Sequence, residues 1–389
     1  MTTAIIISLC ILLLVGYIFE LTAAKTKIPS VILLLLLGWI VKQLTVWFNT
    51  QLPDFSPILP VLGTLGLILI VLEGSLEIEL NKSKSGIIVK SFFGALIPMI
   101  ALGFVLALAF NYFGNFGMKD SLTNAIPFCV ISSAIAIPSV RSLSSYDREF
   151  VVYESSLSDI LGVLFFNFLL LNEIINVFSF EVFIFQLIVM ILISFIATVG
   201  LSYLLSKIEH HIKFVPIILI VVLIYAISKD MHLPSLIFIL IFGLATGNLC
   251  ELKKTKWLAR FNIGELSKEV KKFGDLVAEG TFLIRALFFL LFGYLIETSE
   301  VLNIASLFWA LPIVSFIFVF RAIQLKLSKL PLQPLLFVAP RGLITILLFL
   351  SIDKEHTIPF VNNSLIIQVI ILTALIMMFG LMSNKPQNQ

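Results

Sequence analysis

The chain has 389 residues, of which 59% are hydrophobic and only 13% are charged. Soluble domains carry about 25% charged residues, so this composition excludes an ordinary cytosolic enzyme, and intrinsic disorder requires the opposite balance of charge and hydrophobicity. The net charge of +3 is too small to indicate nucleic acid binding, and the three scattered cysteines indicate neither a disulfide framework nor a metal cluster. The composition predicts an all-α polytopic membrane protein.

Apolar segments follow one another along the whole chain. A helix needs about 20 apolar residues to cross a hydrocarbon core about 30 Å thick, which predicts about 13 transmembrane helices here. Some segments are short or contain proline, so a count of one more or one fewer stays open. The predicted segments are 4–19, 28–41, 57–76, 87–110, 125–140, 152–171, 182–206, 214–228, 234–250, 274–296, 303–320, 331–352 and 361–381.

The positive charges predict the orientation of these segments. With the N-terminus outside, 20 of the 26 Lys and Arg residues face the cytoplasm, four face the outside, and Arg285 and Arg341 lie inside predicted spans. Cytoplasmic loops of membrane proteins are enriched in Lys and Arg. We therefore expect a multi-pass protein of the cell inner (plasma) membrane, with its N-terminus outside and its C-terminus in the cytoplasm.

The first ionisable residue at membrane depth is Glu73, about 13 Å from the inner boundary of its segment. An ionisable side chain within a span costs at least about 2.5 kcal/mol on insertion scales, so it requires a function or a partner. An ion-binding carboxylate and a structurally paired carboxylate are both open interpretations of Glu73.

The segment 125–140 is predicted to be a broken helix. Pro138 removes a backbone donor and clashes with the preceding turn. Ser132, Ser133 and the freed carbonyls would then line a cavity, the only place where irregular backbone is tolerated at membrane depth.

The next segment carries Asp159 about ten residues beyond Glu149, roughly 15 Å deep. Ser155 precedes it by four residues on the same helix face, and Ser158 is its immediate neighbour. Hydroxyl and carboxylate oxygens suit a small hard cation, and a carboxylate can also take a proton. The pattern predicts an ion-binding site at Asp159; an aspartate buried only to bridge helices is the alternative.

Arg285 is the most isolated cation, about 20 Å deep if counted from Lys272. Its guanidinium cannot lose its proton, so it requires an anion, and Glu154, Glu73 and Asp159 are the candidates. We expect a structural ion pair here rather than direct contact with a transported species.

A second break is predicted in the segment 331–352, where Pro340 and Gly342 flank Arg341. One interrupted helix in each half of the chain favours inverted repeats with a site at the midplane. We therefore expect one membrane domain over 1–389 with two six-helix repeats and a linking helix. The expected parts are a first repeat at 1–171, the linking helix at 182–206, a second repeat at 214–381 and a short cytoplasmic tail at 382–389.

These motifs together resemble the monovalent cation/proton antiporter superfamily, in particular bacterial sodium/proton exchangers, over nearly the whole chain. The most specific match is Glu154-Ser155-Ser156-Leu157-Ser158-Asp159, which is similar to the E-S-x-x-N-D helix motif of that family. Further matches are LEGSLEIEL around Glu73, RALFFLLFG around Arg285, and PRGL at 340–343.

The resemblance implies a role for each matching residue. Asp159 matches the carboxylate that alternately binds the cation and the proton, Ser155 a hydroxyl ligand, and Glu73 a nearby acid. Glu154 and Arg285 match a buried ion pair between two core helices. The family fold is a dimer with a scaffold domain and a mobile core that carries two crossed broken helices.

The chain departs from the family pattern in two places. Ser158 stands where the motif has Asn. Ser133-Ala134-Ile135-Ala136 stands where exchangers often carry Thr-Asp-Pro, so this version has no acid. It is closer to the Ser-Ser-x-Ala-Ile of the potassium-efflux branch.

These resemblances imply an electroneutral antiporter that exchanges a monovalent cation for H⁺ by alternating access at one titratable carboxylate, Asp159. Na⁺ is favoured as the cation, with Li⁺ and K⁺ as the other candidates. A K⁺/H⁺ antiporter or K⁺ efflux pathway is the first alternative, and a sodium-coupled organic anion symporter is the second. We expect no cofactor and no enzymatic activity, since neither GxxxxGK[ST] nor HExxH occurs.

Overall fold

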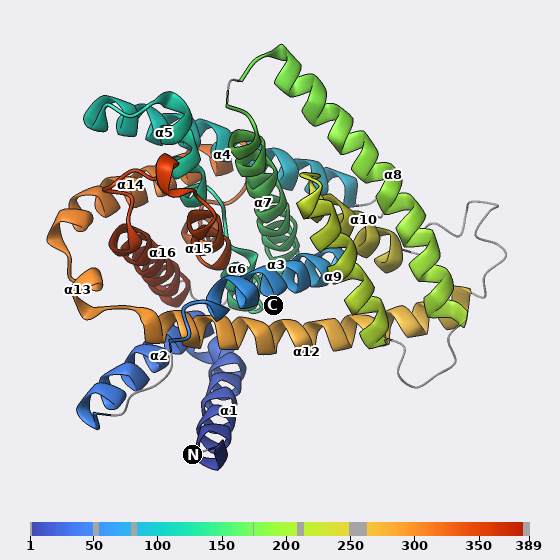
Figure 1. Ribbon diagram of the computed structural model, residues 1–389, viewed down its shortest axis with the longest axis horizontal. Coiled ribbons are helices and arrows are strands. Elements are labelled where there is room, and N and C mark those ends of the chain that lie inside the picture. The colour runs from blue at the N-terminus through green and yellow to red at the C-terminus, as the bar shows by residue number, and fades with distance from the viewer. Residues whose placement is uncertain are drawn as a thin grey trace. The chain divides into compact units, whose positions relative to one another are not determined.

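The computed structural model describes residues 2–49, 54–78, 84–173, 175–207, 214–248 and 263–383, and these residues form helices and connecting segments without any strand (Figure 1). Most of the predicted tail at 382–389 lies outside the described residues. Ten helical spans in the described part are long and apolar enough to cross a membrane. The structure therefore has the all-helical polytopic architecture that the composition predicts.

The helices follow the predicted segments in chain order. They are α1 (Thr2–Thr26), α2 (Ser30–Trp47), α3 (Ile58–Glu77), α4 (Ser85–Gly114), α5 (Met118–Ala125), η2 (Ile126–Phe128), α6 (Ser133–Ser139), α7 (Ser145–Leu171), α8 (Val177–Lys207), α9 (Phe214–Asp230), α10 (Ser235–Gly247), α12 (Ile263–Leu295), α13 (Thr298–Val301), α14 (Ile304–Leu327), η4 (Leu335–Phe337), α15 (Leu343–Leu350), η5 (Lys354–His356) and α16 (Asn363–Ser383).

Three predicted segments are not among the ten long spans. α9 has 17 residues and α10 has 13, so both are slightly short for a span by the length criterion. The third segment, 331–352, is divided between η4 and α15. Each predicted segment is thus occupied by a helix or by a broken helix.

Two helices extend well past their predicted ends. α1 continues to Thr26 rather than residue 19, and α14 continues to Leu327 rather than residue 320. A charged residue after an apolar run does not by itself end a helix. A proline removes a backbone donor and so disfavours continuation of a helix, and a proline follows each of these two ends within about one helical turn. The extensions place Glu20 and Arg321 inside helices.

The chain divides into two compact units. Unit 1 contains Met1–Thr64, Lys90–Gly162 and Leu283–Gln389, and unit 2 contains Leu65–Val89 and Val163–Phe282. Each unit draws on both halves of the chain. The units therefore do not coincide with the repeats expected at 1–171 and 214–381, which stay a prediction.

Unit 1 contains both predicted breaks, and small residues allow its helices to approach closely. A Cβ at Gly38 of α2 would lie 2.2 Å from the Leu290 carbonyl of α12, and a Cβ at Gly293 of α12 would lie 2.3 Å from the Leu35 carbonyl of α2. Close backbone approach at small residues is typical of helix packing in membranes, where no hydrophobic driving force holds helices together.

Unit 2 also has close helix contacts at small residues, and its helices α8 and α10 lie side by side (Figure 1). A Cβ at Gly247 of α10 would lie 2.5 Å from the Leu76 carbonyl of α3. The buried amide of Asn248 donates to the carbonyl of Ile78 at 2.7 Å, which satisfies a backbone group close to the end of α3.

The first broken helix lies in unit 1, but its break is not at the predicted position. Helix η2 ends at Phe128, residues 129–132 are not helical, and α6 begins at Ser133. Pro138 lies inside α6, close to its end. The prediction that Pro138 marks the break is therefore wrong in position. A proline removes the hydrogen bond to the carbonyl four residues earlier, so it limits α6 to a short helix without preventing its first turn.

The second break lies where the sequence predicts it. Helix η4 ends at Phe337, residues 338–342 are not helical, and α15 begins at Leu343. Pro340 and Arg341 both lie in this interruption and are buried. Unit 1 therefore contains two stretches of non-helical backbone at the positions of two predicted spans, which require internal partners for their polar groups.

Candidate functional site

The two breaks contact each other and satisfy each other's backbone groups. The amide of Ser132 in the first break donates to the carbonyl of Pro340 in the second at 2.9 Å. The Arg341 guanidinium donates through Nε to the Phe128 carbonyl at 2.6 Å, at the end of η2. A Cβ at Gly342 would lie 2.8 Å from the Ser132 hydroxyl, so a larger residue there would displace this side chain. Irregular backbone is tolerated at membrane depth because such internal partners replace water.

Asp159 lies against the first break and is 1% exposed. Its Oδ2 accepts a short hydrogen bond from the Ser133 hydroxyl and a second one, at 3.3 Å, from the Ser133 amide. Its Oδ1 has no hydrogen-bond partner, and no cationic side chain forms an ion pair with it within the described parts of the chain. Asp159 is thus a buried carboxylate that contacts only neutral donors.

The other predicted serines surround the same region in different roles. Ser158 accepts a hydrogen bond from the Ile131 amide at 2.9 Å, and so holds the first break against α7. The Ser155 hydroxyl donates to the Val151 carbonyl at 2.7 Å, which leaves its oxygen lone pairs as acceptors. Ser132 is 1% exposed, and its hydroxyl finds no partner among the described residues. Ser158 therefore contacts the first break, Ser132 lies within it, and Ser155 contacts neither the break nor Asp159 through a hydrogen bond in the described residues.

The remaining predicted acid, Glu73, lies in the part of α3 that belongs to unit 2 and is half-buried. Its assignment as an ion ligand stays a prediction. No cluster of three or more His, Cys, Asp or Glu side chains that could hold a metal ion occurs in the described ranges. A cation at Asp159 would therefore depend on one carboxylate with neutral oxygens.

Glu154 does not pair with Arg285, contrary to the expectation from the family resemblance. Its carboxylate pairs instead with Arg321 of α14, and both side chains are 3% exposed or less. Gln324 completes the group, since it donates to Glu154 Oε1 at 2.9 Å and accepts from Arg321 at 2.8 Å. Arg321 also donates to the Leu335 carbonyl at 3.1 Å, at the start of η4. The pair thus connects α7, α14 and the second broken helix.

Arg321 was missed because the predicted span ended one residue before it and placed it in a cytoplasmic loop. The signal was present in the sequence, since FIFVFRAIQLKL contains neither glycine nor proline. A continuous helix places Arg321 and Gln324 on one face, three residues apart, with the guanidinium at membrane depth. An arginine there requires a buried acid.

Arg285 pairs with Glu20, which the predicted segment 4–19 also missed by one residue. Arg285 Nη2 lies 3.3 Å from Glu20 Oε1, and Arg285 Nη1 donates to the Ala134 carbonyl of α6 at 3.5 Å. The other Glu20 oxygen accepts from the Ser30 hydroxyl at 2.6 Å. Arg141, just beyond α6, lies 3.5 Å from Glu20 Oε1 with its side chain 56% exposed. Arg285 therefore has an acidic partner, as expected, but not one of the three candidates.

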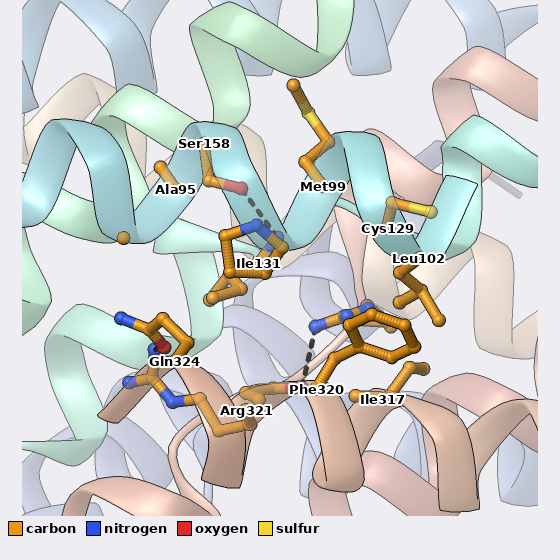
Figure 2. Close-up of a pocket in the computed structure, with 14 residues that line it drawn as sticks. Ala95, Met99, Leu102, Cys129, Ile131, Ser158, Ile317, Phe320, Arg321 and Gln324 are labelled. Atoms are coloured by element: carbon orange, nitrogen blue, oxygen red, sulfur yellow. Dashed lines mark hydrogen bonds between the residues drawn. The ribbon is translucent and has the colours of Figure 1, made fainter. Parts of the chain in front are cut away.

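A small cavity separates the Glu154 group from the first break. Figure 2 shows Ser158 and Ile131 on one wall, and Arg321 with Gln324 on the other. Its volume of about 20 Å³ is enough for one water molecule. Arg341 also lines it, so both broken helices reach the same cavity.

The comparisons with known proteins agree with this arrangement of helices. The family profile described as "Sodium/hydrogen exchanger, transmembrane" matches residues 9–383. A structure of the sodium proton antiporter MjNhaP1 from Methanocaldococcus jannaschii at pH 8 is 18% identical, with a TM-score of 0.70 over 98% of this chain and 96% of that chain. A structure of the same antiporter from an electron microscopy map is 19% identical, with a TM-score of 0.69 over 100% of this chain and 99% of that chain.

No curated protein sequence matches the chain. The two similar structures share its fold, and the family profile covers all but its first and last few residues. The chain belongs to the sodium/hydrogen exchanger family and is a multi-pass membrane protein of the cation/proton antiporter class.

Proposed function

We propose that this protein exchanges Na⁺ for H⁺ by alternating access, and that Asp159 is the carboxylate that both ions share. The observation that carries the proposal is that no cationic side chain of the described residues forms an ion pair with Asp159. A carboxylate that is 1% exposed and has one oxygen without a hydrogen-bond partner in the described residues requires either a proton or a cation to balance its charge. Binding of one ion therefore excludes the other.

The proposed cation ligands are Asp159 Oδ1 and neutral oxygens next to it. Ser133 contacts the same carboxylate, Ser132 has a hydroxyl without a described partner, and Ser155 retains free lone pairs. Hard oxygen ligands suit a small monovalent cation. We assign Ser158 to holding the first break, since its oxygen accepts the Ile131 amide, and Glu73 to a supporting acidic role.

One carboxylate that carries either one Na⁺ or one H⁺ implies an exchange that moves no net charge. The acid that exchangers of this family often carry in the first broken helix is replaced here by Ser133-Ala134-Ile135-Ala136. Exchange should therefore respond to the proton gradient and not to the membrane potential.

The proposed setting is the cell inner (plasma) membrane, with the N-terminus outside and the C-terminus in the cytoplasm. The distribution of Lys and Arg supports this orientation. We further propose a homodimer in the bilayer, on the basis of the family resemblance.

Proteoliposomes with a trapped pH-sensitive dye test the function directly. Addition of Na⁺, Li⁺ or K⁺ outside acid-loaded vesicles should dissipate the pH gradient, with Na⁺ effective at the lowest concentration. Clamping the membrane potential at different values should leave the rate unchanged. A lower effective concentration for K⁺ than for Na⁺ would support the potassium alternative, and the absence of a pH response with all three cations would reject antiport.

A further inference from the structure

The starting observation is a backbone carbonyl of α6 that lacks its regular helical donor. In a regular helix the amide of residue 138 would donate to the carbonyl of Ala134, but Pro138 has no amide hydrogen. Ala134 is 4% exposed, and an unsatisfied carbonyl at this depth is costly. Arg285 Nη1 donates to this carbonyl from α12, at 3.5 Å.

Glu20 in turn holds the guanidinium of Arg285. The Oε1 of Glu20 lies within ion-pair distance of Arg285 Nη2, at 3.3 Å, without a hydrogen bond among the described residues, and its Oε2 accepts a hydrogen bond from Ser30. The side chains of Glu20 and Arg285 are 11% and 10% exposed. Both partners lose most of their hydration at this exposure, so removing one of them would leave the other charge buried and unpaired.

Helix α6 also contains the residue that donates hydrogen bonds to Asp159. Ser133, the residue before Ala134, donates to Asp159 from the first turn of α6 through both its amide and its hydroxyl. A contact that restrains the carbonyl of Ala134 therefore restrains the donors of Ser133. The chain of contacts runs from Glu20 through Arg285 and α6 to Asp159.

We propose that Glu20 and Arg285 are positioning residues for cation exchange: Glu20 orients Arg285, and Arg285 supplies at the Ala134 carbonyl the donor that Pro138 lacks, which keeps Ser133 aligned with Asp159. This inference rests on the proposed role of Asp159 as the exchange carboxylate. Arg285 acts through α6 and does not touch the transported ion, which a guanidinium would repel.

A double variant that replaces both charged residues by neutral ones, here called the neutral pair, tests the proposal without leaving a buried charge unpaired. In Glu20→Gln/Arg285→Gln, the apparent Na⁺ affinity in proteoliposomes should weaken about tenfold, the size expected for one hydrogen bond to a charged group. The maximal rate and the melting temperature in detergent should change little by comparison. Arg141→Gln is the matched control, since it removes only the exposed partner of Glu20, and its affinity should stay within about twofold of wild type.

Restoring the missing amide gives a second, independent test. Pro138→Ala in the Glu20→Gln/Arg285→Gln background supplies a backbone donor to Ala134 and should recover most of the lost affinity. A neutral pair that lowers only the melting temperature, or a triple variant with no recovery, would overturn the positioning role.

Amide hydrogen exchange of the peptide covering 133–139 separates this inference from the proposed function. Faster exchange in the neutral pair together with unchanged cation affinity would show that the contacts order α6 without positioning the ion-binding site, and the activity of Asp159→Asn would then decide separately whether Asp159 is the exchange carboxylate. Unchanged hydrogen exchange in the neutral pair would reject the positioning of α6 itself, whatever role Asp159 has.

Discussion

Glu154 and Asp159 lie on α7 little more than one helical turn apart, and each is 1% exposed, yet their surroundings differ completely. Glu154 has a permanent cationic partner in Arg321 and a further donor in Gln324. Asp159 has only the neutral donors of Ser133 and one oxygen without a partner in the described residues.

The difference supports the two roles that we propose on this helix, a structural one for Glu154 and an exchanging one for Asp159. Arg321 cannot lose its proton, so its ion pair with Glu154 keeps the same charges throughout a transport cycle. Asp159 has no such partner in the described residues, so under our proposal its charge is balanced by a bound proton or cation. The identity of the neighbouring group, rather than depth or burial, separates the two proposed roles.

Asp159→Asn is expected to have the largest effect on exchange. Asparagine keeps the shape of the side chain but cannot bind a proton or supply a negative charge, so cation-dependent pH changes in proteoliposomes should disappear. The melting temperature should stay close to wild type, because no buried ion pair is lost. Glu73→Gln is the comparison variant and should reduce exchange without abolishing it, because we assign Glu73 only a supporting role. Robust pH-dependent exchange in Asp159→Asn would move the site to another carboxylate, and Glu73 would be the first to test.

Arg321→Gln should affect stability instead. It leaves Glu154 buried without a cation, which costs about 3–5 kcal/mol in comparable pairs. Thermal unfolding in detergent measures the loss, and Glu154→Gln in the same chain should restore much of it. Restoration by Glu20→Gln rather than by Glu154→Gln would contradict the pairing described above.

A smaller effect, about tenfold per pH unit, is expected for competition between the two ions. Below the pKa of Asp159, each additional proton displaces one cation, so the apparent Na⁺ affinity should fall by this factor for every unit of decreasing pH. Transport assays at a series of symmetric pH values measure the slope. A slope near a hundredfold per unit would indicate that two protons compete, which is incompatible with a single exchanging carboxylate.

The smallest effects should come from the serines. Ser133→Ala removes a hydroxyl that contacts Asp159 directly and should weaken the apparent Na⁺ affinity about tenfold, whereas the backbone donor remains. Ser155→Ala should weaken it only about threefold, since that hydroxyl already donates to Val151. Equal losses in both variants, measured as apparent affinities in the same vesicles, would mean that the two oxygens are equivalent ligands.

Much of the candidate site could be predicted from local patterns. An aspartate among serines in an apolar segment is visible in the sequence, and so is a proline-arginine-glycine interruption such as the one at 340–342. The partners of the arginines could not be predicted in the same way. Glu20 precedes Arg285 by more than 250 residues in the sequence and lies beside it only because α1 packs near α12.

The helical class, the position of nearly every span and the presence of charges that require partners follow from the sequence alone, because hydrophobicity and proline act locally along the chain. The position of the break in the first broken helix depends on tertiary contacts. The amides of Ile131 and Ser132, and that of Ser133 at the start of α6, donate to acceptors outside their own helix. These acceptors are Ser158 and Asp159 of α7 and the carbonyl of Pro340 in the second break. At membrane depth, a backbone amide without a helical acceptor requires another acceptor within the protein. Here that acceptor comes from parts of the chain that only the packing of the helices brings close.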